Sequence, residues 1–243
     1  MSKEQKKKTV DYGHYVPIPL PEGGEEGVAV LEAGRSLSLL HVVGMTPGDL
    51  PRRFVLREGA SLEVSVFSFP GTSAPLPFEI DLAGEGAQVT LCGLCLCKGE
   101  DKVVVNTSVR HLSPCCQSQQ NFYTIASGHS DVAFNGRIVV APDAQKTEAY
   151  QTNRNILLSE DATIGSTPQL EIYADDVKCS HGATAGSLDE EAQFYMRSRG
   201  IPLLEAKVLQ MLSFASPSLS LIRDEEKREE LSGMIEKAIR DLQ

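Results

Sequence analysis

Two short stretches of the sequence carry the residue types that bind metals in proteins. The first contains Cys179 and His181, separated by a single serine. On a β-strand these side chains would share one face, about 7 Å apart, and a thiolate beside an imidazole suits iron or zinc. A small core cysteine beside a hydrogen-bonded histidine would give the same pattern, and the two residues by themselves favour that structural interpretation.

The second stretch contains Cys92, Cys95 and Cys97, with Cys115 and Cys116 further along the chain. On a strand Cys95 and Cys97 would share a face, while Cys92 would point the other way with its leucine neighbours. A zinc ribbon places its cysteine pairs in loops, whereas these cysteines lie in an apolar run, which favours simple packing. The rival hypothesis is a cysteine-rich metal-binding protein that uses Cys92, Cys95, Cys97 and Cys115 or Cys116.

The motifs of common enzymes are missing from the sequence. It contains neither a Gly-x-x-x-x-Gly-Lys-[Ser/Thr] phosphate loop nor a Gly-x-Ser-x-Gly nucleophile turn. His129, Ser130 and Asp131 have the residue types of a catalytic triad, but contiguous residues cannot face one another as a triad requires. The sequence therefore predicts a protein that is not an enzyme.

Composition and charge narrow the class of partner. The chain of 243 residues has a formal net charge of −10, which argues against binding to nucleic acid or to an anionic membrane surface. No stretch approaches the roughly 20 apolar residues of a membrane-spanning helix, and no apolar run follows the basic residues near the N-terminus. We expect a cytoplasmic protein with a flexible N-terminal segment over residues 1–26.

Residues 27–186 have the pattern of a strand-rich body. Short runs of alternating apolar residues are separated by Gly, Asp, Ser or Pro. The runs are Gly27–Leu31, Ser36–Val43, Ser61–Phe67, Phe78–Leu82, Ala87–Cys97, Val103–Leu112, Asn121–Ile125, Val132–Val140, Ala149–Leu158 and Ala162–Ala174. Glu58-Gly59, Glu85-Gly86 and Glu160-Asp161 each open a run, as successive coils of a solenoid would, and the last two leave room for about four coils of roughly 20 residues. The pattern favours a β-solenoid over a β-sandwich.

Residues 187–243 change to the 3.6-residue periodicity of helices. Ser187 and Glu190 form a capping-box pattern that predicts Ser187 as the N-cap of the first helix. The predicted helices are 189–199, 202–215 and 224–242. We expect a small helical region that is appended to the β body.

Three collinear segments carry a family likeness by their order and spacing. They are Gly165–Ile172, Asp176–Thr184 and Asp189–Ile201, and the likeness extends over roughly residues 133–215. These segments resemble the SufB/SufD family of the SUF iron–sulfur cluster assembly system. Residues 153–158 hold no cysteine where SufB carries one, so the chain is most similar to a short SufD without the N-terminal helical region.

The resemblance implies a right-handed parallel β-helix over residues 27–186 and a partner-docking helical region over residues 187–243. It implies a non-catalytic scaffold that docks a SufC-type ABC ATPase and pairs with SufB or with a second copy of itself. It also implies no tightly bound cofactor, with an iron–sulfur cluster or iron held only transiently. The functional histidine of the family matches His181, and Cys179 lies beside it as a second candidate ligand. The docking residues expected on the helices are Phe194, Tyr195, Arg197, Arg199, Ile201, Leu204 and Leu209.

Overall fold

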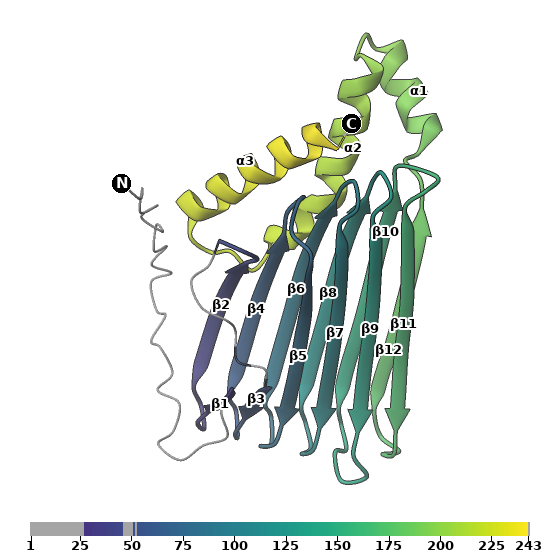
Figure 1. Ribbon diagram of the computed structural model, residues 1–243. Helices are drawn as coiled ribbons and strands as arrows, with labels where there is room; N and C mark the ends of the chain where they lie inside the picture. The colour runs from purple at the N-terminus through teal and green to yellow at the C-terminus, as the bar shows by residue number, and fades with distance from the viewer. Residues whose placement is uncertain (1–26, 46–50, 52, 243) are drawn as a thin grey trace.

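The computed structural model describes residues 27–45, 51 and 53–242, so the predicted flexible segment 1–26 lies outside the described residues. The body is a coil of parallel strands whose two walls face each other, and helices cover part of one wall (Figure 1). One wall, sheet A, has the order β1-β3-β5-β7-β9-β11, and the other, sheet B, has the order β12-β10-β8-β6-β4-β2. The prediction of a mainly β solenoid is confirmed.

Most strand bounds follow the predicted runs, although β5 and β8 each begin four residues earlier than predicted. The strands are β1 Val28–Leu31, β2 Ser36–Val42, β3 Arg53–Leu56, β4 Ser61–Ser68, β5 Ala74–Leu82, β6 Gln88–Cys97, β7 Lys102–His111, β8 Gln117–Ala126, β9 Asp131–Val140, β10 Glu148–Leu157, β11 Thr163–Ile172 and β12 Lys178–Gly186. The ten predicted runs did not include β3 or β12, the second of which has mostly small or polar residues and shows no apolar alternation.

The coils are longer than the sequence suggested. Lys102 pairs with Asp131, 29 residues further on, and Gln117 pairs with Glu148, 31 residues further on. The prediction of roughly 20 residues was wrong because each coil contains two strands, one in each sheet, together with two turns, and strands such as β7 and β8 have ten residues each. Consecutive strands therefore belong to opposite walls, and every neighbour within a wall is the next strand but one.

Residues with a left-handed backbone conformation lie above one another in the turns that connect strands of sheet A to the following strands of sheet B. Gly59 and Gly86 have φ angles of 62° and 70°, and each donates its N–H to a backbone carbonyl of the next coil. Cys115 and Lys146 occupy the equivalent positions with φ of 59°. Two of the three predicted openings fall at these turns, but Glu160-Asp161 lies at the opposite edge, between β10 and β11. The three openings are therefore not equivalent positions of one repeat.

Apolar side chains from both walls fill the interior of the coil. Phe122 of β8 and Phe134 of β9 pack there with their ring centroids 5.2 Å apart, and both are almost completely buried. Leu62, Leu91 and the branched side chains of neighbouring strands belong to the same cluster. Burial of apolar area at about 25 cal/mol per Å² makes this interior the main source of stability.

The C-terminal helices build a second core on the outer face of sheet B (Figure 1). They are α1 Glu190–Ser198, α2 Leu203–Ala215, the short 3-10 helix η1 Ser216–Leu219 and α3 Glu225–Asp241. Phe214 of α2 meets Tyr123 of β8 edge to face, with ring centroids 5.6 Å apart. Among the described residues, no helix has both the length and the apolar character needed to cross a membrane.

The first helix begins two residues later than its capping pattern suggested. Asp189, not Ser187, is the N-cap, and its carboxylate accepts hydrogen bonds from the backbone N–H groups of Glu191 and Ala192. A charged carboxylate at a helix N-terminus also interacts favourably with the helix dipole, which a serine hydroxyl does less well. The predicted capping box of Ser187 and Glu190 was therefore wrong.

Candidate functional site

The coil has an open end at its last turn. Among the described strands, β11 pairs only with β9 and β12 pairs only with β10, so each has one free side. The N–H of Lys178 bonds to the carbonyl of Thr147, the residue that precedes β10, and residues of a parallel strand alternate between their two neighbours. The N–H groups of Cys179, His181 and Ala183 therefore point to the free side of β12. A free strand edge of this kind is a template for pairing with another chain.

Cys179 and His181 lie on this terminal strand and share the face that looks into the coil. Cys179 is in register with Ala149, and His181 is in register with Gln151. Ala149 and Gln151 are both buried inside the coil, and side chains at matched positions of neighbouring strands lie on the same face. The His181 side chain is exposed and Cys179 is half-buried, because no further coil covers them.

The protonation of Cys179 bears on its ability to bind a metal. Burial raises the pKa of the Cys179 thiol, and a backbone hydrogen bond with Ala149 offsets part of that rise. The thiol is therefore mostly protonated at neutral pH, and it must lose a proton before it can bind a metal. The other candidate ligand is a ring nitrogen of His181, and imidazole nitrogen suits iron and zinc.

Polar side chains line the interior directly beneath the terminal strand. Gln151, Asn153 and Asn155 of β10 are all buried and face inward. Asn155 donates from Nδ2 to the carbonyl of Thr184 on β12 at 2.9 Å, whereas the side-chain oxygens of Gln151, Asn153 and Asn155 have no hydrogen-bond partner among the described residues. The sequence prediction did not include Gln151. The signal that could have found it is polar residues in alternation, where earlier strands place apolar ones.

The rival cysteine site is not formed. Cys95, Cys97 and Cys116 belong to the interior of the coil, while Cys92 packs on the outer face of sheet B beneath the helices. Cys115 is exposed in a turn. The prediction that Cys95 and Cys97 share a face opposite to Cys92 is confirmed. Because the thiols lie on two sides of one sheet, they cannot surround a single ion.

Burial also keeps these thiols protonated. It raises the pKa of Cys92 to about 11 and that of Cys95 to about 12, and it raises the pKa of Cys97 as well. The described residues contain no group of three or more potential ligands (His, Cys, Asp or Glu) arranged to hold a metal ion. These cysteines are therefore core residues, as the packing interpretation expected.

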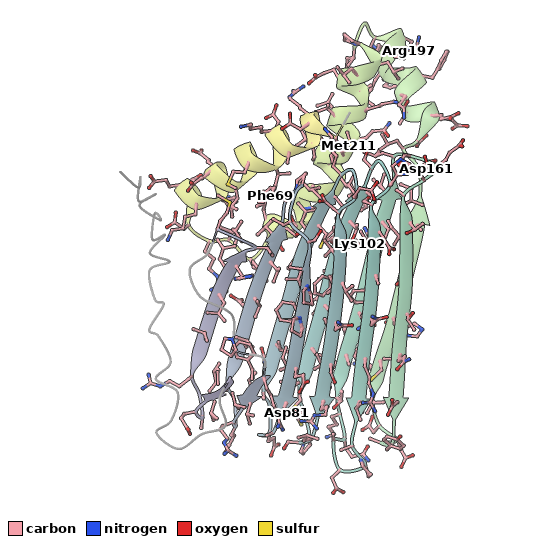
Figure 2. The ribbon with its side chains drawn as sticks, in the orientation of Figure 1. Phe69, Asp81, Lys102, Asp161, Arg197 and Met211 are labelled. Atoms are coloured by element: carbon pink, nitrogen blue, oxygen red, sulfur yellow. The ribbon has the colours of Figure 1, made fainter. Side chains whose placement is uncertain are left out.

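A second candidate surface lies on the α1–α2 hairpin, which projects from the body at the end near the last strands (Figure 2). Its side chains include Phe194 with 73% of its surface exposed, Tyr195 with 61% and Leu204 with 57%. The Arg199 guanidinium lies 5.3 Å from the centre of the Tyr195 ring. Arg197 is exposed on α1, Leu209 is exposed on α2, and Ile201 between them is half-buried. Large apolar side chains gathered on a projecting hairpin indicate a protein-binding surface.

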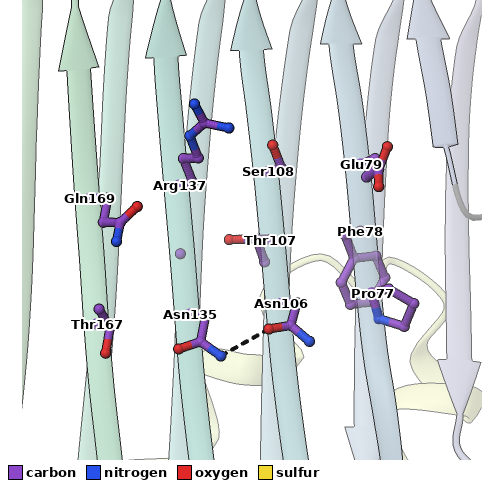
Figure 3. A pocket seen from close by; sticks show the side chains of 11 residues that line it. Pro77, Phe78, Glu79, Asn106, Thr107, Ser108, Asn135, Arg137, Thr167 and Gln169 are labelled. Carbon is purple, nitrogen blue, oxygen red and sulfur yellow. Dashed lines mark hydrogen bonds between the residues drawn. The ribbon is translucent and has the colours of Figure 1, made fainter.

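A third feature is a shallow groove of about 390 Å³ on the outer face of sheet A (Figure 3). Its floor includes Asn106 and Asn135, and Asn135 Nδ2 donates to Asn106 Oδ1 at 2.9 Å. Arg137 lines the groove but already forms two hydrogen bonds with Glu171. This groove was not predicted from the sequence, because its polar residues align only once the 29-residue spacing between neighbouring strands of sheet A is known.

The fold and these surfaces define a class of protein: a parallel β-solenoid with a free C-terminal edge and a helical appendage that presents apolar side chains. Residues 51–214 match the family model for the SufBD core domain of the SUF system of iron–sulfur cluster assembly. The chain therefore belongs to the SufBD core family, and its sequence is SufD-like.

Three curated relatives illustrate the similarity. The iron–sulfur cluster assembly protein SufD of Escherichia coli is 39% identical over 154 residues, which are 63% of this chain and 36% of that protein. A SufBD family protein of Synechocystis is 34% identical over 138 residues, 57% of this chain and 30% of its own length. The chloroplastic protein ABCI7 of Arabidopsis thaliana is 31% identical over 195 residues, 79% of this chain and 41% of its own length. The chain thus spans about a third to two fifths of these relatives.

Proposed function

We propose that this protein is a non-catalytic scaffold subunit of a SUF-type iron–sulfur cluster assembly complex. It pairs through β12 with SufB or with a second copy of itself, and it docks a SufC-type ABC ATPase through its C-terminal helices. The observation that carries the proposal is the free β12 edge, because that same strand bears Cys179 and His181. A partner strand added there would bring its own side chains beside these two residues.

The helical surface supports the second half of the proposal. Exposed aromatic and leucine side chains are costly to leave in water and are enriched where proteins bind one another. Phe194 and Tyr195 of α1 and Leu204 of α2 supply such side chains, and Arg197 and Arg199 add positive charge beside them. The sequence has no phosphate loop of its own, which fits a subunit that binds an ATPase.

His181 has a role in binding or positioning rather than in turnover. Its ring is exposed at the open end, where it can bind iron or a nascent cluster as cargo. Cys179 stays protonated until a metal or a nearby positive charge lowers its pKa, so we assign it the lesser role. The cluster is held transiently and is passed on, and the protein retains no cofactor.

A complementation assay tests the role of His181. His181→Ala should lower the yield of clusters on a target protein while leaving the fold and ATPase binding intact, because the side chain is exposed and packs against little. The matched control is Ser180→Ala, which alters the neighbouring position on the opposite face of the strand. A yield equal to that of the unaltered protein for His181→Ala would reject the assigned role.

A proline on the free edge tests pairing itself. Ala183→Pro removes an N–H that points away from β10, so it should weaken strand addition without breaking the β10–β12 ladder. Ala183→Ser keeps the N–H and serves as the control. Complex formation measured by analytical ultracentrifugation should fall for the proline variant alone. Equal assembly of the two variants would show that the partner does not add a strand at β12.

A further inference from the structure

Two buried glutamines, Gln120 and Gln151, lie in a column of inward-facing residues that ends at His181, and we call this pair the amide ladder. On the inner face of sheet B, Leu91, Gln120, Gln151 and His181 occupy matched positions of four successive strands. Gln120 and Gln151 are 0% and 2% exposed. The column therefore changes from apolar to polar over the two coils that precede the open end.

The ladder has a direction. Gln151 donates from Nε2 to Oε1 of Gln120 at 3.3 Å, which leaves two buried atoms without a partner among the described residues: the donor Nε2 of Gln120 and, on the side of the open end, the acceptor Oε1 of Gln151. A buried acceptor is unfavourable unless a donor reaches it. The next position in the column belongs to His181, whose ring carries an N–H donor in either neutral tautomer.

The opposite wall leaves room for the Gln151 amide. Gly136 of β9 faces it, and a Cβ atom placed on that glycine would lie 2.3 Å from Gln151 Nε2. The φ angle of Gly136 is not in the left-handed region, so the backbone itself does not require a glycine there. The absence of a side chain at this position is what allows the amide to occupy the interior.

We propose that Gln151 is a positioning residue for His181. Its Oε1 accepts a hydrogen bond from the Nδ1–H of the imidazole once the ring turns inward, and this bond fixes the tautomer that leaves Nε2 free for a ligand. Histidines that bind metals usually donate their second nitrogen to such an acceptor. The inference rests on the proposed role of His181, which it extends by naming the group that orients the ring.

The tautomer of His181 can be read directly in the whole 243-residue chain. Nitrogen-15 NMR spectra of the histidine side chains, recorded at pH 9, above the ordinary pKa of an imidazole, separate the two neutral forms. His181 should be mainly Nδ1–H in the unaltered protein and mainly Nε2–H in Gln151→Met, which keeps the length of the side chain but loses the acceptor. Gln151→Glu restores an acceptor and should keep the Nδ1–H form.

Two controls separate orientation from general disturbance. Thr152→Val alters the neighbouring residue on the outer face of β10 and should leave the tautomer unchanged. Gln120→Met breaks the bond that orients Gln151 and should shift the tautomer in the same direction by a smaller amount, which also tests the ladder if Gln151→Met does not fold. An unchanged tautomer in both methionine variants would overturn the proposal.

The same variants distinguish the role of His181 in cluster assembly from the role of Gln151 in positioning the His181 ring. If His181→Ala lowers cluster yield while the tautomer is indifferent to Gln151, the scaffold role stands and the positioning role is wrong. If the tautomer follows Gln151 but His181→Ala leaves cluster yield unchanged, the ladder stands and the assigned function of His181 is wrong. Agreement of both predicts that Gln151→Met lowers cluster yield in the same direction as His181→Ala.

Discussion

The middle coils and the last coil of the solenoid have the same backbone arrangement but differ in the side chains that fill their interior. Inward positions of β6 carry Val89, Leu91 and Cys95, all buried in the main core. The matched inward positions two strands later, on β10, include Gln151 and Asn155. Apolar filling stabilises the middle of the coil, whereas polar filling on β10 places hydrogen-bonding groups next to β12, the strand whose edge is free. The difference separates a region that holds the fold from a region that meets a partner.

The largest expected effect compares the two regions by truncation. Phe134→Ala removes a buried ring that packs on Phe122, so the free energy of unfolding should fall by about 3–5 kcal/mol. His181→Ala at the open end should lower it by no more than about 1.5 kcal/mol, the contribution of a single hydrogen bond. Urea unfolding followed by circular dichroism measures both. Similar losses for the two variants would contradict the division of the coil into a stabilising middle and a functional end.

The second effect depends on pH and concerns His111, at the end of β7. The His111 ring is fully buried, with Nε2 lying 2.8 Å from Ser118 Oγ, and burial lowers its pKa to about 4. Between pH 6.5 and pH 4 the unfolded chain therefore binds a proton that the folded protein does not. The free energy of unfolding should fall by about 3 kcal/mol on account of this residue as the pH drops through that window, and no further below it.

Replacing His111 with leucine tests whether this residue causes the pH dependence. His111→Leu should remove most of the pH dependence between pH 6.5 and pH 4, as measured by urea unfolding at a series of pH values. Val109→Ala, on the same strand and face, should lower stability by a constant amount and keep the pH dependence. If the free energy of unfolding of His111→Leu still fell between pH 6.5 and pH 4, another group would be responsible.

The third effect concerns the space beside Gly136 of sheet A, which the Gln151 side chain occupies. Gly136→Ala should lower the free energy of unfolding by about 1–3 kcal/mol, because the new Cβ meets the Gln151 amide. Gly165→Ala on β11 has nothing within 4 Å of its Cβ and should be nearly neutral. Combining Gly136→Ala with Gln151→Ala should cost less than the two losses added together. Strict additivity would show that the two residues do not meet.

The smallest effect concerns the stacked turns. Lys146 holds a left-handed conformation with φ of 59° at a position where two earlier coils use Gly59 and Gly86. Lys146→Gly should raise the free energy of unfolding by up to about 1 kcal/mol, since glycine adopts this conformation without strain. Gly86→Ala should lower it by a similar amount. Thermal melting of the two variants should move in opposite directions, and a decrease for Lys146→Gly would contradict the account of the turns.

The sequence predicted what depends on local alternation. The apolar runs placed most strands, and the two faces of the Cys92–Cys97 segment followed from the two-residue period of a strand alone. The coil length could not be read in this way, because runs on opposite walls look alike until the pairing is known. For the same reason Glu160-Asp161 resembled Glu85-Gly86 although the two lie at opposite edges.

The candidate site likewise has residues that local pattern predicted and residues that depend on the register between distant strands. The pattern at Cys179 and His181 and its family likeness identified the terminal strand, and strand geometry gave their common face. Gln151 was not predicted, because its relation to His181 depends on a register between residues 30 positions apart. The N-cap of α1 was misplaced because Ser187 and Asp189 both suit a cap, and only the observed hydrogen bonds to Asp189 decide between them.

Co-expression of this chain with SufC and SufB from its own source, followed by affinity capture and native mass measurement, tests the scaffold most directly. Because α2 and α3 cover the outer face of sheet B, the comparison should use the exposed substitutions Phe194→Asp and Leu204→Asp rather than a deletion of the helices. The account predicts a stable complex that loses the ATPase but keeps the SufB partner in these variants. Failure of the unaltered chain to capture either partner would contradict it.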